Sequence, residues 1–260
     1  MNDRKKSLAE FNRLLDIIGE LRIKCPWDMK QTNDSLRKLT IEETYELAES
    51  ISSGNDAGIK NELGDIMLHI VFYAKIGSEK GAFTMAEVLE GINNKLTYRH
   101  PHVFGDVKVS GASEVEENWE QLKIREDNGY KPVLSGVPSS LPAIIKANRI
   151  QEKVRGVGFD WEKREQIWDK VQEEIAELKE EIENHNTESI ESELGDVLFS
   201  IINASRLYGI DPEAALEKTN RKFIKRFNFL EKETLKKGIS LHNMSLDEMN
   251  VIWEDAKKED

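Results

Sequence analysis

The feature of this sequence that most restricts its fold is an internal repeat. Two acidic motifs, EExxE and ExxD, occur at residues 42–46 and 62–65 and again at 173–177 and 193–196. Every acid of the second pair follows its counterpart at one constant offset, and fifteen residues separate the two motifs in both copies. Chance is a poor explanation for motifs that keep the same order and spacing. The sequence therefore predicts a duplicated unit of about 130 residues.

The segment between the copies has a composition that breaks helices. Residues 126–142 contain three of the six prolines of the chain and two glycines. Proline lacks a backbone N–H and glycine favours turns, so both residues interrupt regular helices. We expect a first domain at residues 1–125, a linker at 126–142 and a second domain at 143–260.

The rest of the chain reads as helix. Capping-box patterns begin at Thr84 and Ser245, and Asp211-Pro212 combines an N-cap residue with proline at the first helical position. Few segments alternate polar and apolar residues with period two, so the evidence for strands is weak. We predict an all-α fold of two tandem helical-bundle domains.

The segment that follows each ExxD motif predicts association. Residues 66–74 and 197–204 are apolar on nearly every side of a helix, which is typical of a helix buried all round. A domain of about 125 residues with four or five helices can hardly enclose such a helix alone. We expect the two copies to pair and the intact chain to form a homodimer.

Composition excludes several classes of function. The net charge is −12, which argues against a protein that coats nucleic acid with a basic face. No apolar run approaches the roughly 20 residues of a membrane span, and no secretory signal is visible. The single cysteine, Cys25, forms no disulfide within the chain, which fits a cytoplasmic location.

The repeated acids have the spacing of a metal site. Residues three or four apart share one face of a helix, so Glu173, Glu174 and Glu177 would meet Glu193 and Asp196 across an antiparallel hairpin. Carboxylates that converge without basic partners repel each other, and Mg²⁺ or Mn²⁺ relieves that repulsion. The alternative is a structural or surface role, in which Thr40-x-x-Glu43 is only a capping box.

A pair of basic residues follows the acids in both copies. Lys222 and Arg226 are four residues apart, as are Lys95 and Arg99. Such a pair can hold phosphate oxygens from one helix face. The alternative is a solvated basic face, since the 212–237 helix carries further basic residues. Recurrence in both copies favours phosphate binding.

Six segments of the chain together resemble the MazG family of nucleoside triphosphate pyrophosphohydrolases. They are CPWD at 25–28, LTIEETYEL at 39–47, ELGD at 62–65, RHPHVF at 99–104, VGFDW at 157–161 and KF–KRF at 222–227. The resemblance spans nearly the whole chain. It implies a dimeric all-α enzyme that uses Mg²⁺, with Mn²⁺ as a substitute. Such enzymes hydrolyse NTPs and dNTPs between the α- and β-phosphates, giving a nucleoside monophosphate and pyrophosphate.

The resemblance also assigns roles to residues of the second copy, which in this family is the one usually credited with catalysis. It implies that the metal ligands are Glu174, Glu177, Glu193 and Asp196, and that Glu173 orients or activates water. It implies that Lys222 and Arg226 contact the triphosphate, with Lys170 and Trp253 completing the substrate site. Relatives can carry a lysine shortly before ExxD where this chain has Ser189, so one phosphate contact differs.

The first copy keeps the same residue types. They are Glu42, Glu43, Glu46, Glu62, Asp65, Lys95 and Arg99. This copy is a second active site, a regulatory nucleotide site or a structural relic. For the whole chain, the alternatives to an enzyme are a non-catalytic NTP-binding sensor and a helical interaction protein.

Overall fold

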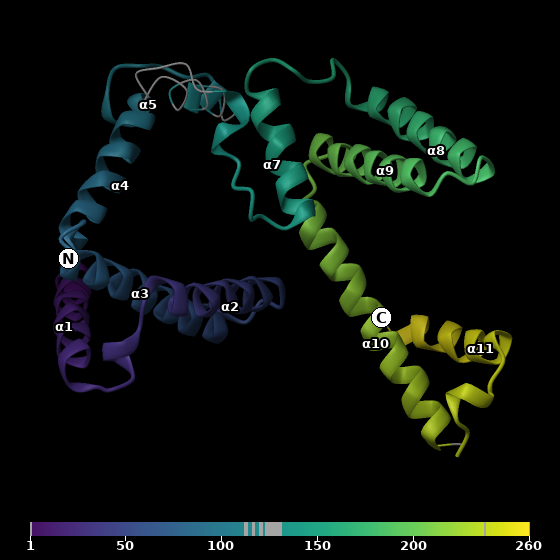
Figure 1. Cartoon of the computed structure of the whole chain (residues 1–260), viewed down its shortest axis with the longest axis horizontal. Helices are drawn as coiled ribbons and strands as arrows, with labels where there is room; N and C mark the ends of the chain where they lie inside the picture. Colours follow the sequence, from purple (N-terminus) through teal and green to yellow (C-terminus); the bar gives the residue numbers. More distant parts are fainter. Residues whose placement is uncertain are drawn as a thin grey trace. The chain divides into compact units, whose positions relative to one another are not determined.

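The computed structural model describes residues 2–111, 114–115, 118–119, 122, 132–236 and 238–259. The chain divides into two compact units, Met1–Ser110 and Gly111–Asp260. Every element in the described part of the chain is helical, so the predicted all-α class is confirmed (Figure 1). The domain boundaries stay a prediction, since residues 126–131 of the expected linker lie outside the described residues. Among the described helices, none is long and apolar enough to cross a membrane.

The first unit is built from five α-helices and one short 3₁₀ turn. In chain order they are α1 (Asn2–Lys24), η1 (Asp28–Lys30), α2 (Asn33–Ser52), α3 (Asp56–Glu79), α4 (Met85–Arg99) and α5 (Pro101–Phe104). Helices α2 and α3 form a hairpin, and α1 packs on α3. The core of the unit lies between these three helices and consists of Ile18, Leu36, Val71, Phe72 and Ile76.

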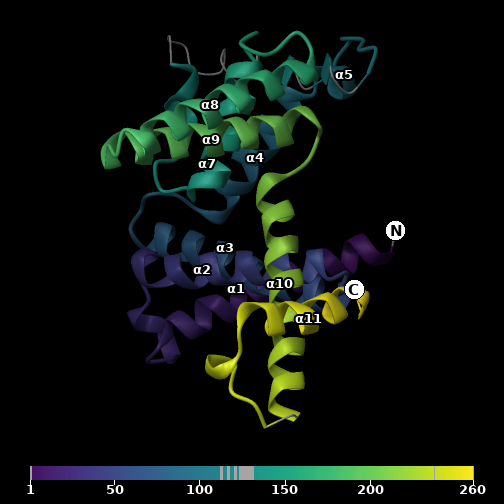
Figure 2. The ribbon, with the colours of Figure 1, turned by 90° about the vertical axis from the view of Figure 1, so that its right-hand side faces the viewer.

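The second unit repeats the hairpin and continues into two C-terminal helices. Its elements within the described residues are η2 (Val133–Gly136), α7 (Ala143–Arg155), η3 (Arg164–Gln166), α8 (Ile167–Glu183), α9 (Thr187–Leu207), α10 (Pro212–Lys236), η4 (Leu241–Asn243), α11 (Leu246–Ala256) and η5 (Lys257–Glu259). Helices α8 and α9 pair extensively around Ile167, Val171 and Ala204. Helix α11 packs against α10, as Figure 2 shows, and α10 also contacts α7 and α9.

The two hairpins turn in the same way. Asn55 caps α3 by accepting a hydrogen bond from the N–H of Gly58, and Asn186 caps α9 by accepting one from the N–H of Ser189. The residue before each cap lies in the left-handed region, with φ of 67° at Gly54 and 59° at His185. This shared geometry fixes how each ExxD helix starts relative to the EExxE helix.

The apolar helices are buried on one side only. Their outer sides carry a stripe of exposed residues, which recurs at the same offset as the acidic motifs. The stripe consists of Leu63, Met67 and Ile70 on α3 and of Leu194, Leu198 and Ile201 on α9. All six side chains are at least 40% exposed within the single chain. Burial on every side is therefore not reached within either unit.

Candidate active site

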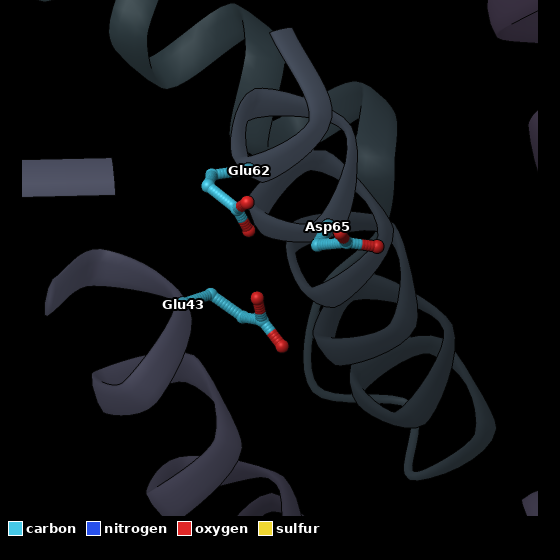
Figure 3. A group of neighbouring side chains, drawn as sticks. All are labelled: Glu43, Glu62 and Asp65. Carbon is cyan, nitrogen blue, oxygen red and sulfur yellow. The ribbon is translucent and has the colours of Figure 1, made fainter. Parts of the chain in front are cut away.

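The first unit brings three of the predicted acids together. Glu43 extends from α2 toward Glu62 and Asp65 on α3 (Figure 3). Each of these residues offers a carboxylate oxygen, and the three atoms lie within 4.8 Å of one another. Glu62 and Asp65 share a helix face because they are three residues apart. Glu42 and Glu46 lie on the same helix as Glu43 but outside this group.

The closeness of these acids affects the protonation of Glu43. Its pKa is raised by burial and by the negative charges of Asp65, Glu46 and Glu62. A raised carboxyl pKa means that the site disfavours the charged form of the side chain. A divalent cation would reverse this preference, so the donor set fits a hard metal ion such as Mg²⁺.

The second unit repeats the arrangement with the equivalent residues of its hairpin. Glu174 on α8 is buried, and it lies with Glu177 and Glu193 in a group whose carboxylate oxygens are within 4.8 Å. Partial desolvation and the charge of Glu174 raise the pKa of Glu177. Asp196 is exposed one turn beyond Glu193 and lies outside the group, so the group contains three of the four expected ligands.

A lysine enters the acidic group of the second unit. The Lys170 ammonium lies 2.8 Å from an oxygen of Glu173 and 2.8 Å from an oxygen of Glu174. These two hydrogen bonds raise the pKa of Lys170. Glu173, the expected water-orienting acid, is therefore held by Lys170 in this structure.

The capping explanation of the first EExxE motif is wrong. Thr40 lies inside α2, which begins at Asn33 and is capped by Thr32. The Thr40 hydroxyl hydrogen-bonds with the carbonyl of Leu36 and the hydroxyl of Tyr73. Glu43 therefore has no capping role. The expected boxes at Thr84 and Ser245 are confirmed, as is the cap at Asp211.

The basic residues of the second unit lie on a different element from the acids. Lys222 is exposed and Arg226 half-buried, both on α10. Trp253 of α11 contacts the same stretch of α10, with its ring centroid 5.0 Å from that of Phe223. The structure therefore groups Lys222, Arg226 and Trp253 on the α10–α11 pair, while the carboxylates belong to the α8–α9 hairpin.

The first unit separates its basic residues from its acids in the same way. Lys95 is exposed and Arg99 half-buried, and both lie in the last turns of α4. Sequence reasoning missed the pairing of Lys170 with the acids and the two asparagine caps. Both have signals in the sequence. Lys170 precedes Glu173 and Glu174 by three and four residues, and each asparagine lies in the fifteen-residue segment between the two acidic motifs.

Fold and site together define a tandem all-helical protein with a group of converging carboxylates in the hairpin of each copy. The MazG nucleotide pyrophosphohydrolase domain matches the chain twice, at residues 31–104 and 162–229. The chain belongs to the MazG nucleotide pyrophosphohydrolase family, so the predicted family and class of enzyme are confirmed.

Two relatives that match over nearly their whole length agree with this assignment. The chain is 44% identical over 250 residues to the nucleoside triphosphate pyrophosphohydrolase/pyrophosphatase MazG of Thermotoga maritima, covering 95% of each chain. It is 36% identical over 260 residues to the nucleoside triphosphate pyrophosphohydrolase of Escherichia coli K12, covering 97% of this chain and 99% of the relative. It is also 42% identical to the uncharacterized protein YabN of Bacillus subtilis, matching 54% of that longer chain.

Proposed function

We propose that this protein hydrolyses ribonucleoside and deoxyribonucleoside triphosphates to a nucleoside monophosphate and pyrophosphate. The reaction uses Mg²⁺ at the acidic group of the second unit. The observation that carries the proposal is the convergence of Glu174, Glu177 and Glu193 within 4.8 Å. The names of the full-length relatives support the substrate class. Mn²⁺, which takes the same oxygen ligands, is expected to substitute.

The residues of the acidic group would bind the cation and activate water. Glu174, Glu177 and Glu193 would hold the cation, with Asp196 joining from the next turn of α9. The bound cation would supply positive charge to phosphate oxygens and lower the pKa of water. Once Lys170 has moved away from Glu173, the Glu173 carboxylate would accept the proton of the attacking water.

The bond changes balance without a further reactant. The water oxygen bonds to the α-phosphorus, the bond from that phosphorus to the bridging oxygen of the β-phosphate breaks, and pyrophosphate leaves. Lys222 and Arg226 would stabilise the negative charge that builds on the leaving pyrophosphate. Trp253, together with Phe223, provides an aromatic surface beside these bases for the nucleoside. In such a transfer the protein mainly positions groups and supplies charge.

Paired variants test which copy carries the reaction. Glu193→Gln should abolish Mg²⁺-dependent pyrophosphate release, whereas Glu62→Gln should reduce it less. Glu191→Gln is the matched control, because this exposed residue lies on the same helix and outside the acidic group. Equal losses in the two variants would refute the assignment to the second unit. Nucleotide binding by the wild type without pyrophosphate release would instead support a sensor.

The first unit is a second cation site in this proposal. Its acids Glu43, Glu62 and Asp65 also have carboxylate oxygens within 4.8 Å of one another. The substrate panel for the assay includes canonical and modified NTPs and dNTPs, compared by kcat/KM. Cys25 is a free thiol, consistent with the cytoplasmic location that we predict.

We also propose that the exposed apolar stripes pair, so that the chain forms a homodimer. The stripes of α3 and α9 lie at matching positions beside the acids. Removing such apolar surface from water favours association. Leu198→Glu should shift the mass measured by light scattering toward a single chain. Ile182→Glu on α8 is the control, since Ile182 is exposed to a similar degree but lies outside the stripe.

A further inference from the structure

The acidic groups of the two units differ in one charged residue. In the second unit, Lys170 makes ion pairs of 2.8 Å with both Glu173 and Glu174. The equivalent position of the first copy is Leu39, which packs against the apolar core of the first unit. The charges that act on Glu43 in the first unit are those of Asp65, Glu46 and Glu62, all of them negative.

The helix geometry places Lys170 beside the acids of the second unit. Lys170 precedes Glu173 by three residues and Glu174 by four, so the three side chains share one face of α8. The Glu174 side chain is 10% exposed and that of Lys170 is 36% exposed. The Lys170 ammonium group thus contacts a buried carboxylate from the solvent side. Because the Lys170 side chain is partly exposed, it has room to move away from Glu174.

The Glu174 carboxylate that Lys170 contacts belongs to the group that we propose binds the metal. Glu174 is the buried member of the set formed with Glu177 and Glu193. An ammonium ion and a divalent cation satisfy the same requirement, which is positive charge beside converging carboxylates. Two cations held beside one carboxylate repel each other, so the ammonium group and the divalent cation compete for Glu174.

We propose that Lys170 is an internal counter-ion of the metal-free second unit, and that a divalent cation displaces it from Glu174 when the site loads. The freed ammonium group then binds a phosphate oxygen of the triphosphate. This inference rests on the proposed function, because it takes the metal to bind at Glu174. Its consequence is that metal binding without nucleotide is weak in the second unit, and that metal and triphosphate bind there cooperatively.

Binding of Mn²⁺ to the nucleotide-free full-length protein tests the proposal. The variants are made in a Glu62→Gln background, so that the acidic group of the first unit contributes no signal. Free Mn²⁺ is measured by electron paramagnetic resonance for Lys170→Met and for the parent. Methionine keeps an apolar side chain of similar shape and removes the ammonium group with its charge and its hydrogen-bond donors. Lys179→Met is the matched control, because Lys179 is on the same helix but faces away from Glu174.

The two readouts should move in opposite directions. Lys170→Met should tighten Mn²⁺ binding about fivefold, the size expected when two partly exposed ion pairs no longer have to be broken. Lys179→Met should change it by less than about twofold. A non-hydrolysable α,β-methylene nucleoside triphosphate should bind Lys170→Met more weakly in the presence of Mn²⁺. A purely structural role for Lys170 would not produce this reversal.

Two outcomes separate the possible failures. If Lys170→Met and Lys179→Met bind Mn²⁺ alike while Glu174→Gln abolishes binding, the counter-ion proposal is overturned and the metal site stands. If Glu174→Gln leaves Mn²⁺ binding unchanged, the metal does not bind at this group and the proposed function loses its site. Lys170→Gln serves as a second variant if Lys170→Met is poorly folded.

Discussion

Replacing Glu43 by glutamine tests whether the acids of the first unit converge at a cost to folding. The change keeps the shape of the side chain and removes one charge from the group with Glu62 and Asp65. At 4.8 Å, two unit charges repel by about 0.9 kcal/mol in water and by about 3.5 kcal/mol at an effective dielectric constant of 20. Asp65 is exposed, so values near the lower limit apply. Removing both repulsions should stabilise the metal-free protein by about 1–2 kcal/mol.

The assay is thermal unfolding of the full chain in EDTA and in Mg²⁺. In EDTA, Glu43→Gln should melt above the wild type, by about 4 °C or more for each kcal/mol gained by a domain of this size. Mg²⁺ should raise the melting temperature of the wild type more than that of the variant, because a cation stabilises only the form that binds it. Glu49→Gln, an exposed change on the same helix and outside the group, should shift neither value.

The pH dependence of the stability difference between Glu43→Gln and the wild type is a second test of this repulsion. Burial and neighbouring acids raise the folded-state pKa of Glu43, so the folded protein binds this proton more tightly than the unfolded chain. The repulsion is therefore relieved as the pH falls through the raised pKa, and the advantage of the variant should shrink toward pH 5. A variant that melts below the wild type in EDTA would refute the reasoning. So would an advantage that grows on acidification.

Two further predictions concern the stability of the units. Arg206→Met should destabilise the second unit by about 2–3 kcal/mol in chemical unfolding, because Nη1 of the buried Arg206 donates a 3.0 Å hydrogen bond to Asp160. Burial acts to raise the pKa of Asp160, but the hydrogen bonds and charge of Arg206 outweigh it and hold that pKa below its usual range. The stability that this pair contributes should therefore be lost only as the pH falls through the lowered pKa. Burial lowers the pKa of His69, so its share of stability is present above pH about 6.5 and is lost as the pH falls through the lowered value. His69→Asn should flatten the fall in melting temperature between pH 7.5 and 5.5, and an unchanged slope would contradict this account.

The repeat made most of the fold predictable. The constant offset between the copies pairs Asn55 with Asn186 and Gly54 with His185, so one local turn geometry is encoded twice. The all-α class followed from helical periodicity and from caps such as Thr84, which satisfy backbone groups close in sequence. Local interactions of this kind can be read from spacing, because both partners lie within one turn of helix.

The convergence of Glu43 with Glu62 was predictable for a related reason. A hairpin of fixed loop length places acids of one helix opposite acids of the next, so the spacing between the motifs carries a tertiary contact. The interior position of Thr40 was not predictable in this way. The start of α2 is fixed by the cap at Thr32, and the Thr40 hydroxyl instead reaches Tyr73, a partner distant in sequence.

The difference between the two sites depends on a single aligned position that repeat matching conceals. Leu39 and Lys170 precede the same acids by the same spacing, yet one contributes to a core and the other to an ionic network. A comparison of the two motifs detects the acids that both copies share and does not include the position occupied by Leu39 or Lys170. The electrostatics of the site depend on that neighbour, because the Lys170 ammonium lies 2.8 Å from Glu174 and, in our proposal, competes with a metal ion for this carboxylate. Two copies with the same acids can therefore differ in when they bind a metal ion.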